Sequence, residues 1–148
     1  FYDADSTYRV TAQAEILIND PIFSMPTFTG GGQQYIRYAV LKFVLKGKPM
    51  QLTIYKSVAL AKIPQYSDYL FIPFTDETNG STTYGGGRYI DMRTGDFKNN
   101  TVIVDFNKAY NPYCAFGGGY TCPKPPDENN LQFAIEAGEQ LYAGDKKY

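Results

Sequence analysis

Apolar and polar residues alternate regularly near the start of the chain. Between residues 8 and 18, apolar side chains occupy the even positions, and polar residues such as Arg9, Gln13 and Glu15 occupy odd ones. A period of two residues places the two sets on opposite faces of a β-strand. The pattern therefore predicts a strand with one face buried and the other in water.

A second alternating run covers residues 34–46 and is followed, after Gly47, by a third at 50–58. A turn over residues 46–49 joins the two runs into a hairpin, because glycine favours tight turns. Cross-strand apolar pairs stabilise a hairpin, so we predict the register that forms three of them. The predicted pairs are Leu45 with Met50, Phe43 with Leu52, and Leu41 with Ile54.

Shorter apolar runs predict further strands and one turn. The strands are expected at residues 69–74, 88–92, 101–106 and 131–137. Residues 57–66 predict a short helical turn, which Pro64 limits because proline cannot donate a backbone hydrogen bond. In the last strand, three apolar side chains face the core: Leu131, Phe133 and Ile135.

The strands at 88–92 and 101–106 predict a second hairpin. Its natural register places Arg88 opposite Asp105, on the same face as an isoleucine pair. A partly desolvated pair of this kind either fixes the register or presents the guanidinium to an anionic ligand. The structural role is the commoner of the two in folded proteins.

Seven or so short strands with turn signals between them indicate an all-β fold that is mainly antiparallel. The arrangement is a β-sandwich or a partly closed β-barrel, with long ordered loops and little helix. No repeat or linker divides the chain, so residues 1–148 are expected to form a single β domain. The chain opens on Phe1 rather than on methionine, and we expect that an upstream N-terminal segment has been removed.

Charge and missing residue types exclude several classes of protein. The net charge is −1 and no basic block is present, so we expect no nucleic-acid partner. No apolar run approaches the ~20 residues of a transmembrane helix. The chain has no histidine, which excludes Ser-His-Asp and Cys-His catalysis and histidine zinc sites. Two cysteines cannot form a four-thiolate site and no calcium-loop pattern occurs, so we expect no metal and no cofactor.

The segment from Asp105 to Pro123 concentrates Asn, Tyr, Cys and Pro more densely than any other part of the chain. Prolines restrict its backbone, which predicts a loop of fixed shape at a strand end, where binding sites are common. Cys114 and Cys122 have seven residues between them, a spacing that suits neither a redox pair nor a zinc site. They form a disulfide in an oxidising compartment or remain two buried thiols in a reducing one.

Side chains in and around this segment are the candidate site residues. The candidates for ligand binding are Arg88, Asp105, Asn107, Tyr110, Asn111, Cys114 and Glu139. In a chain without histidine, carboxylates are the remaining acid–base groups. Asp105 and Glu139 are therefore the catalytic candidates, although acids on an exposed face are the more ordinary interpretation.

Six short segments carry a resemblance to a known family. They are residues 70–74 (LFIPF), 83–89 (TYGGGRY), 105–107 (DFN), 109–114 (AYNPYC), 122–126 (CPKPP) with Asn129, and 137–139 (AGE). In these segments the chain resembles the uncharacterised bacterial family catalogued as domain of unknown function 1684. The resemblance implies no activity, but it implies extra residues ahead of this domain. It also implies one structural or functional unit made of Arg88, Asp105, Asn107, Tyr110, Asn111, Cys114, Cys122 and Glu139.

Three functions are compatible with these features. The first is a module that binds a small molecule or a carbohydrate-class ligand in a polar Arg/Asn/Tyr cleft at the sheet edge. The second is a histidine-independent, carboxylate-based hydrolase or lyase. The third is a structural or interaction domain of the cell envelope, which predicts no pocket beneath residues 107–122. A periplasmic or cell-envelope location is favoured over a cytoplasmic one, and no oligomeric state is predicted.

Overall fold

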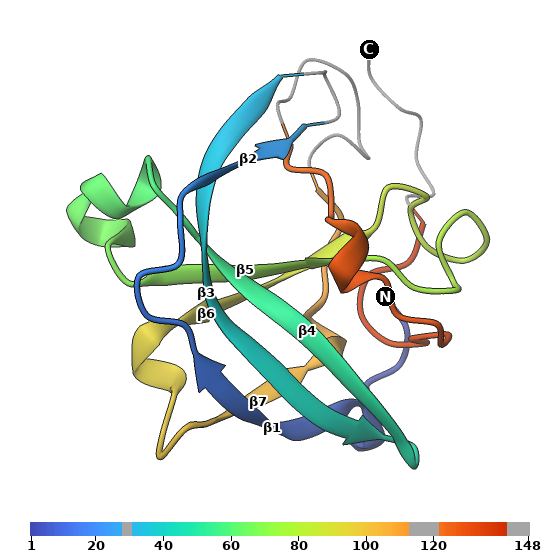
Figure 1. Cartoon of the computed structure of the whole chain (residues 1–148). Helices are drawn as coiled ribbons and strands as arrows, with labels where there is room; N and C mark the ends of the chain where they lie inside the picture. The colour runs from blue at the N-terminus through green and yellow to red at the C-terminus, as the bar shows by residue number, and fades with distance from the viewer. Residues whose placement is uncertain (28–30, 113–121, 142–148) are drawn as a thin grey trace.

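The protein is all-β, as the sequence predicts, and the computed structural model describes residues 1–27, 31–112 and 122–141 (Figure 1). The strands are β1 (Arg9–Ile16), β2 (Phe23–Pro26), β3 (Gly32–Leu45), β4 (Lys48–Ser57), β5 (Tyr69–Phe74), β6 (Arg88–Arg93) and β7 (Thr101–Asp105). Short 3-10 turns lie between and beside them: η1 (Ser6–Tyr8), η2 (Leu60–Lys62), η3 (Pro64–Tyr66), η4 (Thr94–Asp96), η5 (Phe106–Lys108) and η7 (Asp127–Asn129). In these described ranges, no helix is long and apolar enough to cross a membrane.

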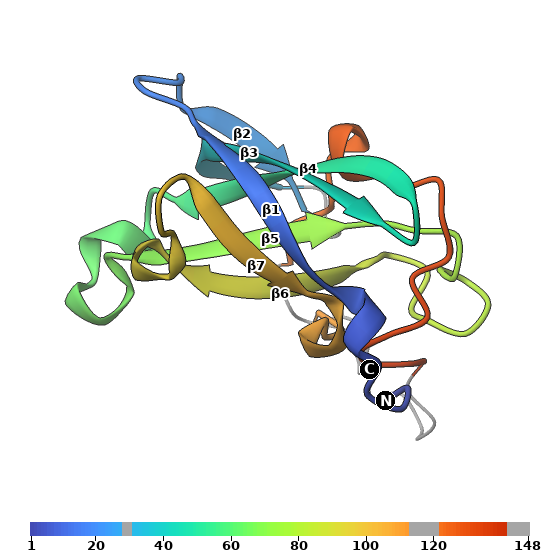
Figure 2. The same ribbon diagram turned by 90° about the horizontal axis from the view of Figure 1, so that it is seen from below.

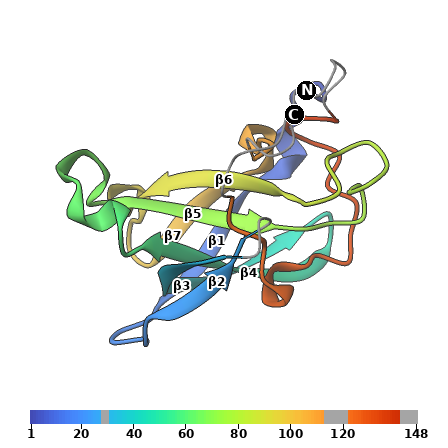
Figure 3. The same cartoon turned by 90° about the horizontal axis from the view of Figure 1, so that it is seen from above.

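All seven strands belong to one sheet in the order β6-β5-β4-β3-β1-β7, with β2 paired to the first part of β3. Every pairing is antiparallel. Figures 2 and 3 show that the sheet curls, so that β7 at one edge comes close to β6 at the other. Residues of both edge strands line a cavity between them. The single curled sheet corresponds to the partly closed barrel of the two predicted arrangements.

β3 and β4 form the predicted hairpin, but its register differs from the prediction by two residues. Lys46 and Gly47 make a two-residue turn with φ values of 49° and 81°, the positive values that a type I′ turn requires. Leu45 therefore lies opposite Lys48 instead of Met50, and the other two predicted pairs shift in the same way. The predicted four-residue turn is wrong. Because the shift is even, each apolar side chain keeps its predicted face.

A β-bulge in the middle of β3 reverses the direction in which its side chains point. Arg37 lies opposite Tyr55 and Ala39 lies opposite Ile54, so Tyr38 is an extra residue with none opposite it in β4. Tyr55 and Ile54 point to opposite faces of β4 because they are consecutive. Odd-numbered residues of β3 therefore point to one face before the bulge and to the other face after it.

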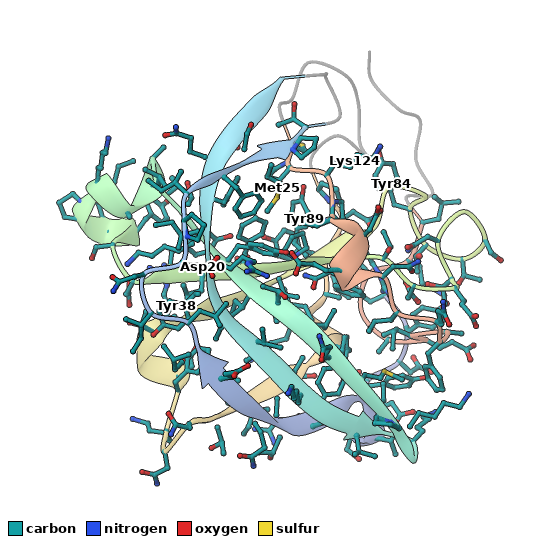
Figure 4. All side chains as sticks on the ribbon, viewed as in Figure 1. Asp20, Met25, Tyr38, Tyr84, Tyr89 and Lys124 are labelled. Carbon is teal, nitrogen blue, oxygen red and sulfur yellow. The ribbon has the colours of Figure 1, made fainter. Side chains whose placement is uncertain are left out.

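The two faces of the sheet carry two separate apolar clusters. The larger cluster lies inside the curl, takes residues from every strand except β2, and is the hydrophobic core. Phe106 closes one end of it, with its ring centroid 5.8 Å from that of Phe43 and 5.6 Å from that of Phe74. The smaller cluster lies on the opposite face and consists of Met25, Tyr35, Tyr55, Phe71 and Tyr89. In Figure 4 the labelled side chains of Met25 and Tyr89 lie between β2 and β5.

The predicted hairpin of β6 with β7 is wrong, although both strands are present where they were expected. β6 pairs with β5, which places Arg88 opposite Phe74, and β7 pairs with β1, which places Asp105 opposite Arg9. Arg88 and Asp105 therefore do not form an ion pair. Both observed pairings align apolar residues on the inner face of the sheet. A strand distant in the sequence can provide this alignment as well as the neighbouring strand of a hairpin.

The predicted strand at residues 131–137 is also wrong, because this segment is irregular in the structure. Two of its three predicted inward residues, Leu131 and Ile135, are buried. Its backbone bonds to the chain that leaves β5. The Leu131 amide donates to the Thr75 carbonyl at 2.8 Å, and the Ile135 amide donates to the Asp76 carboxylate at 2.7 Å. These contacts satisfy the backbone without a strand ladder.

Other sequence predictions are confirmed. β5 covers the predicted residues and is buried on nearly its whole length, and η2 and η3 are the helical turn predicted at 57–66. The first strand is present but ends at Ile16, so that Ile18 is 82% exposed rather than buried.

Asn129 connects β4 and β5 where their backbones separate. The two strands share a single residue pair, Tyr55 with Phe71. Beside it, the Asn129 side chain accepts a hydrogen bond from the Thr53 amide at 2.7 Å. It also donates to the carbonyls of Thr53 and Pro73, both at 2.8 Å. One buried amide thus satisfies three backbone groups that have no partner across the strand gap.

Replacing Asn129 with alanine is expected to lower the free energy of unfolding by about 3 kcal/mol, because buried backbone groups lose their partners. Asn130→Ala is the matched control, since Asn130 is exposed and adjacent. Its expected effect is within about 0.5 kcal/mol. Urea unfolding of both variants measures the difference, and equal losses would contradict the role given to Asn129.

Candidate functional site

Arg88 is fully buried, and its guanidinium donates hydrogen bonds to backbone carbonyls. Nη1 donates to the carbonyl of Ala137 and, at 3.3 Å, to that of Glu139. Nη2 donates to the Ile135 carbonyl at 3.0 Å and lies 3.5 Å from a carboxylate oxygen of Asp76. The arginine therefore holds the irregular segment after η7 against the core, as a planar fork with several donors can do.

Asp76 is the buried counterpart of Arg88. Both side chains have no exposed surface, and burial lowers the pKa of Arg88 while the Asp76 charge opposes that change. Asp76 also accepts hydrogen bonds from the Ile135 amide at 2.7 Å and the Thr78 hydroxyl at 2.8 Å. The opposite charges of the pair compensate each other inside the protein. Arg88 Nε has no hydrogen-bond partner, but the guanidinium has no exposed surface to offer an anionic ligand.

Asn107 forms a local bracket at the start of the candidate segment. Its side chain accepts from the Asp5 amide and donates to the Asp5 carbonyl, both at 2.9 Å. It also donates to the Asp105 carboxylate at 2.9 Å, which accepts from the Asn107 amide at 3.0 Å. These contacts fasten the N-terminal segment to the end of β7.

Asn111 and Glu139 form a second bracket. The Asn111 amide donates to the Glu139 carboxylate at 2.7 Å, and the Asn111 side chain donates to the Gln140 carbonyl at 3.0 Å. Nearby, Gly138 has φ of +81° and lies so close to Ala109 that a Cβ there would be 2.8 Å from its carbonyl oxygen. Glycine is therefore required for the two segments to approach each other.

The structure does not bring the candidate residues to one cavity. Arg88 faces the core, Asp105 lines the gap between β6 and β7, and Glu139 is bound to Asn111. Tyr110 is the described candidate that lines the aromatic pocket defined below. Cys114 lies outside the described residues. Cys122 is 5% exposed, is disulfide-bonded and lines that same pocket.

A cavity of about 430 Å³ lies on the sheet face opposite the hydrophobic core. Six aromatic side chains line it: Tyr35, Tyr66, Tyr69, Phe71, Tyr89 and Tyr110. We call it the tyrosine pocket. Leu60, Pro112, Cys122 and Pro123 complete its apolar wall. Its size lies in the range of small-molecule sites, which are concave and mostly apolar with a few polar groups.

Asp91 is the charged residue among the described residues of this wall. It lies on β6 opposite Phe71, and one of its oxygens, Oδ1, accepts two phenol hydrogen bonds. Tyr69 donates at 2.8 Å and Tyr110 donates at 2.6 Å. The carboxylate thus fixes two rings that come from distant parts of the chain.

Burial raises the pKa of four tyrosines of the pocket and so favours their neutral form. It raises the pKa of Tyr35 to about 12. Burial is also the largest cause that raises the pKa of Tyr69, Tyr89 and Tyr110, and at Tyr69 and Tyr110 the Asp91 carboxylate adds to the increase. These phenols are therefore hydrogen-bond donors rather than nucleophiles or bases near neutral pH.

A second cavity of about 360 Å³ lies between the edge strands β6 and β7. Its walls carry charges of both signs, including Arg9, Asp91, Asp105 and Lys108. Mixed exposed charges without a shared orientation are typical of solvated surface. Across the described ranges, no group of three or more metal-ligating side chains gathers here or elsewhere.

The sequence reasoning missed most of the tyrosine pocket. Tyr69 and Phe71 lie in an apolar run that predicts a strand but not a pocket, and Tyr35 precedes a bulge that a regular alternation does not reveal. A usable signal was the high tyrosine content, since buried tyrosines require partners for their hydroxyl groups. Asp91, between β6 residues that point into the core, supplies two of those partners.

The fold and its pocket define an all-β protein with an aromatic cavity outside the core. The chain belongs to the family described as protein of unknown function (DUF1684), whose model matches residues 1–140. A solution NMR structure of an uncharacterised protein from Haloarcula marismortui is similar to it, with 31% identity and a TM-score of 0.74. The match covers 95% of this chain and 74% of that one. No curated protein matches.

Arg88→Lys is expected to lower the free energy of unfolding by about 3 kcal/mol, because lysine keeps the charge but cannot bond to several carbonyls at once. Arg93→Lys is the control, since Arg93 is largely exposed and pairs with Asp68 at the surface. That change should cost less than about 0.5 kcal/mol. Chemical unfolding of the two variants compares them, and a similar small loss in both would contradict the clamp.

The raised pKa of Tyr35 predicts a loss of stability at alkaline pH. In the unfolded chain the phenol ionises near its ordinary value of 10.0, whereas in the folded protein it stays neutral to about 12. Its contribution is therefore complete below pH 10 and falls as the pH rises towards 12. Unfolding of Tyr35→Phe across this range should show a smaller decline than the wild type, and parallel declines would refute the effect.

Proposed function

We propose that this protein is a small-molecule-binding module whose ligand lies in the tyrosine pocket. One observation carries the proposal: a cavity of about 430 Å³ is lined by six aromatic rings and one carboxylate. Aromatic walls contribute large apolar area, and a single placed polar group orients a ligand. The site differs from the Arg/Asn/Tyr cleft expected from the sequence, because the arginine and the asparagines are used inside the fold.

Rigid elements support the pocket. Tyr69, Phe71, Tyr89 and Asp91 lie on the paired strands β5 and β6, and Tyr35 lies on β3. The Tyr89 and Tyr110 rings meet edge to face with centroids 5.8 Å apart, and their backbones form a bridge. A site built on strands needs little reorganisation when it binds, which lowers the entropic cost of association.

The two alternative functions have less support. In a carboxylate-based hydrolase or lyase, two acids must flank one reacting bond. The candidate acids here are engaged separately, Asp105 with Asn107 and Glu139 with Asn111. A purely structural or interaction domain predicts no pocket next to the candidate segment, whereas Tyr110 and Cys122 line one.

Filling the pocket tests the proposal. Leu60→Trp places a larger side chain on its wall, so small-molecule fragments that bind the wild type should lose affinity by about tenfold or more. Ile63→Trp is the matched control on the same turn, because Ile63 is 41% exposed and does not line the pocket. Ligand-observed NMR with a fragment library measures both variants.

Two results would contradict the proposal. In the first, no fragment binds the wild-type protein. In the second, fragments bind Leu60→Trp as well as they bind Ile63→Trp, which would place their site elsewhere. Thermal unfolding of both variants checks that any loss of binding occurs in folded protein.

A further inference from the structure

We infer that the ligand of the tyrosine pocket is an organic cation of the alkylated-ammonium class. The inference rests on the proposed function, since it names the chemistry that the same pocket recognises. Three features of the wall carry it: its charge, the orientation of its rings and the state of its phenol hydroxyls.

The charge of the wall disfavours an anionic ligand. The described lining residues include one carboxylate, Asp91, and neither lysine nor arginine. An anion placed there would lose its hydration and face a negative charge without a counter-ion. A cation would instead gain a nearby opposite charge, although Asp91 is exposed and water screens part of the attraction.

Three neighbouring pairs of lining rings meet at steep angles, whereas Tyr69 and Phe71 lie nearly parallel at 8°. Tyr66 and Tyr69 are inclined at 79°, Phe71 and Tyr89 at 86°, and Tyr89 and Tyr110 at 88°. Several aromatic rings that enclose a space attract an alkylated ammonium group through their negative faces.

The protein already places one of its own cations against this aromatic wall. The Arg93 guanidinium lies 5.8 Å from the Tyr66 ring centroid and 5.7 Å from that of Tyr69. Its charge is paired with Asp68 at 2.9 Å, so it does not neutralise Asp91. Two of the lining rings therefore take part in cation–π contacts in the structure itself.

The phenol hydroxyls argue against a sugar or another polyhydroxyl ligand. Tyr69 and Tyr110 donate their protons to Asp91, and Tyr89 donates to the Pro123 carbonyl. Tyr35 donates to the side-chain oxygen of Gln33 at 3.1 Å. These four tyrosines offer ring surface to a ligand rather than hydroxyl protons. The burial that raises their pKa keeps those protons in place near neutral pH.

One carboxylate oxygen is left for the ligand. Both phenol hydrogen bonds to Asp91 end on Oδ1, and no hydrogen bond from the described residues reaches Oδ2. Aromatic walls with one negatively charged hydrogen-bond acceptor suit a cation that carries apolar substituents. The pocket thus combines the two attractions that such a cation can use, ring faces and one counter-charge.

The test compares choline with 3,3-dimethylbutan-1-ol, in which carbon replaces the charged nitrogen at the same shape. NMR titration of the full chain is expected to show choline binding at least about tenfold more tightly than the neutral alcohol. Asp91→Asn keeps an oxygen that can accept from the tyrosines but removes the charge. It should weaken choline about tenfold and change binding of the neutral alcohol by less than about twofold.

A second variant keeps the test independent of Asp91. Tyr66 is 42% exposed, so Tyr66→Leu replaces a ring with an aliphatic side chain at little cost to folding. It should reduce choline affinity severalfold, whereas Tyr66→Phe, which keeps the ring, should not. Equal binding of choline and the alcohol, with no effect of Asp91→Asn, would overturn the cation assignment.

The outcomes separate the two levels of the proposal. If library fragments occupy the pocket but choline does not, the ligand class is wrong and the binding module stands. If neither choline nor any fragment loses affinity for the Leu60→Trp variant, both the ligand class and the proposed function fail.

Discussion

The extra residue in β3 is the constraint on which the two faces of this protein depend. Tyr38 has no residue opposite it in β4. Tyr35 and Ala39 therefore point to opposite faces of the sheet, although both are odd-numbered residues of β3. The later part of the strand closes the core, while the earlier part and β2 fold over the opposite face. Without the bulge, the aromatic side chains of β5 and β6 on that face would lack their cover of β2 and β3 residues.

Polar residues that resemble a site serve mostly to hold irregular backbone in this fold. Arg88 binds three carbonyls of a segment that forms no strand, and Asn129 bridges a gap between two strands. Losing a partner of such a buried group is costly, because it leaves an unsatisfied charge or amide. The dense polar motif thus stabilises the loops around the pocket, and under the proposed function the rings, rather than these polar groups, contact the ligand.

Local periodicity explains which features were predictable from the sequence. Alternation identified β1, β3 and β4, and the buried run identified β5, because side-chain direction in a strand depends only on neighbouring residues. The partner of β7 was not predictable in this way, since hairpin and non-local pairing satisfy the same apolar pattern. The hairpin register depended on whether the turn contains the two residues 46–47 or the four residues 46–49. The pocket was missed because Tyr69 and Tyr89 share strands with core residues. Tyr35 reaches the same face only because the bulge changes the direction of the β3 side chains.

Amide NMR mapping of a bound ligand tests the central claim most directly, namely that one sheet face is core and the other is a binding surface. Shifts should concentrate on Tyr69, Tyr89, Asp91 and Tyr110, the pocket residues on or beside β5 and β6. Shifts that instead gather around Asp105, in the gap between β6 and β7, would contradict the account and return the site to the acidic residues.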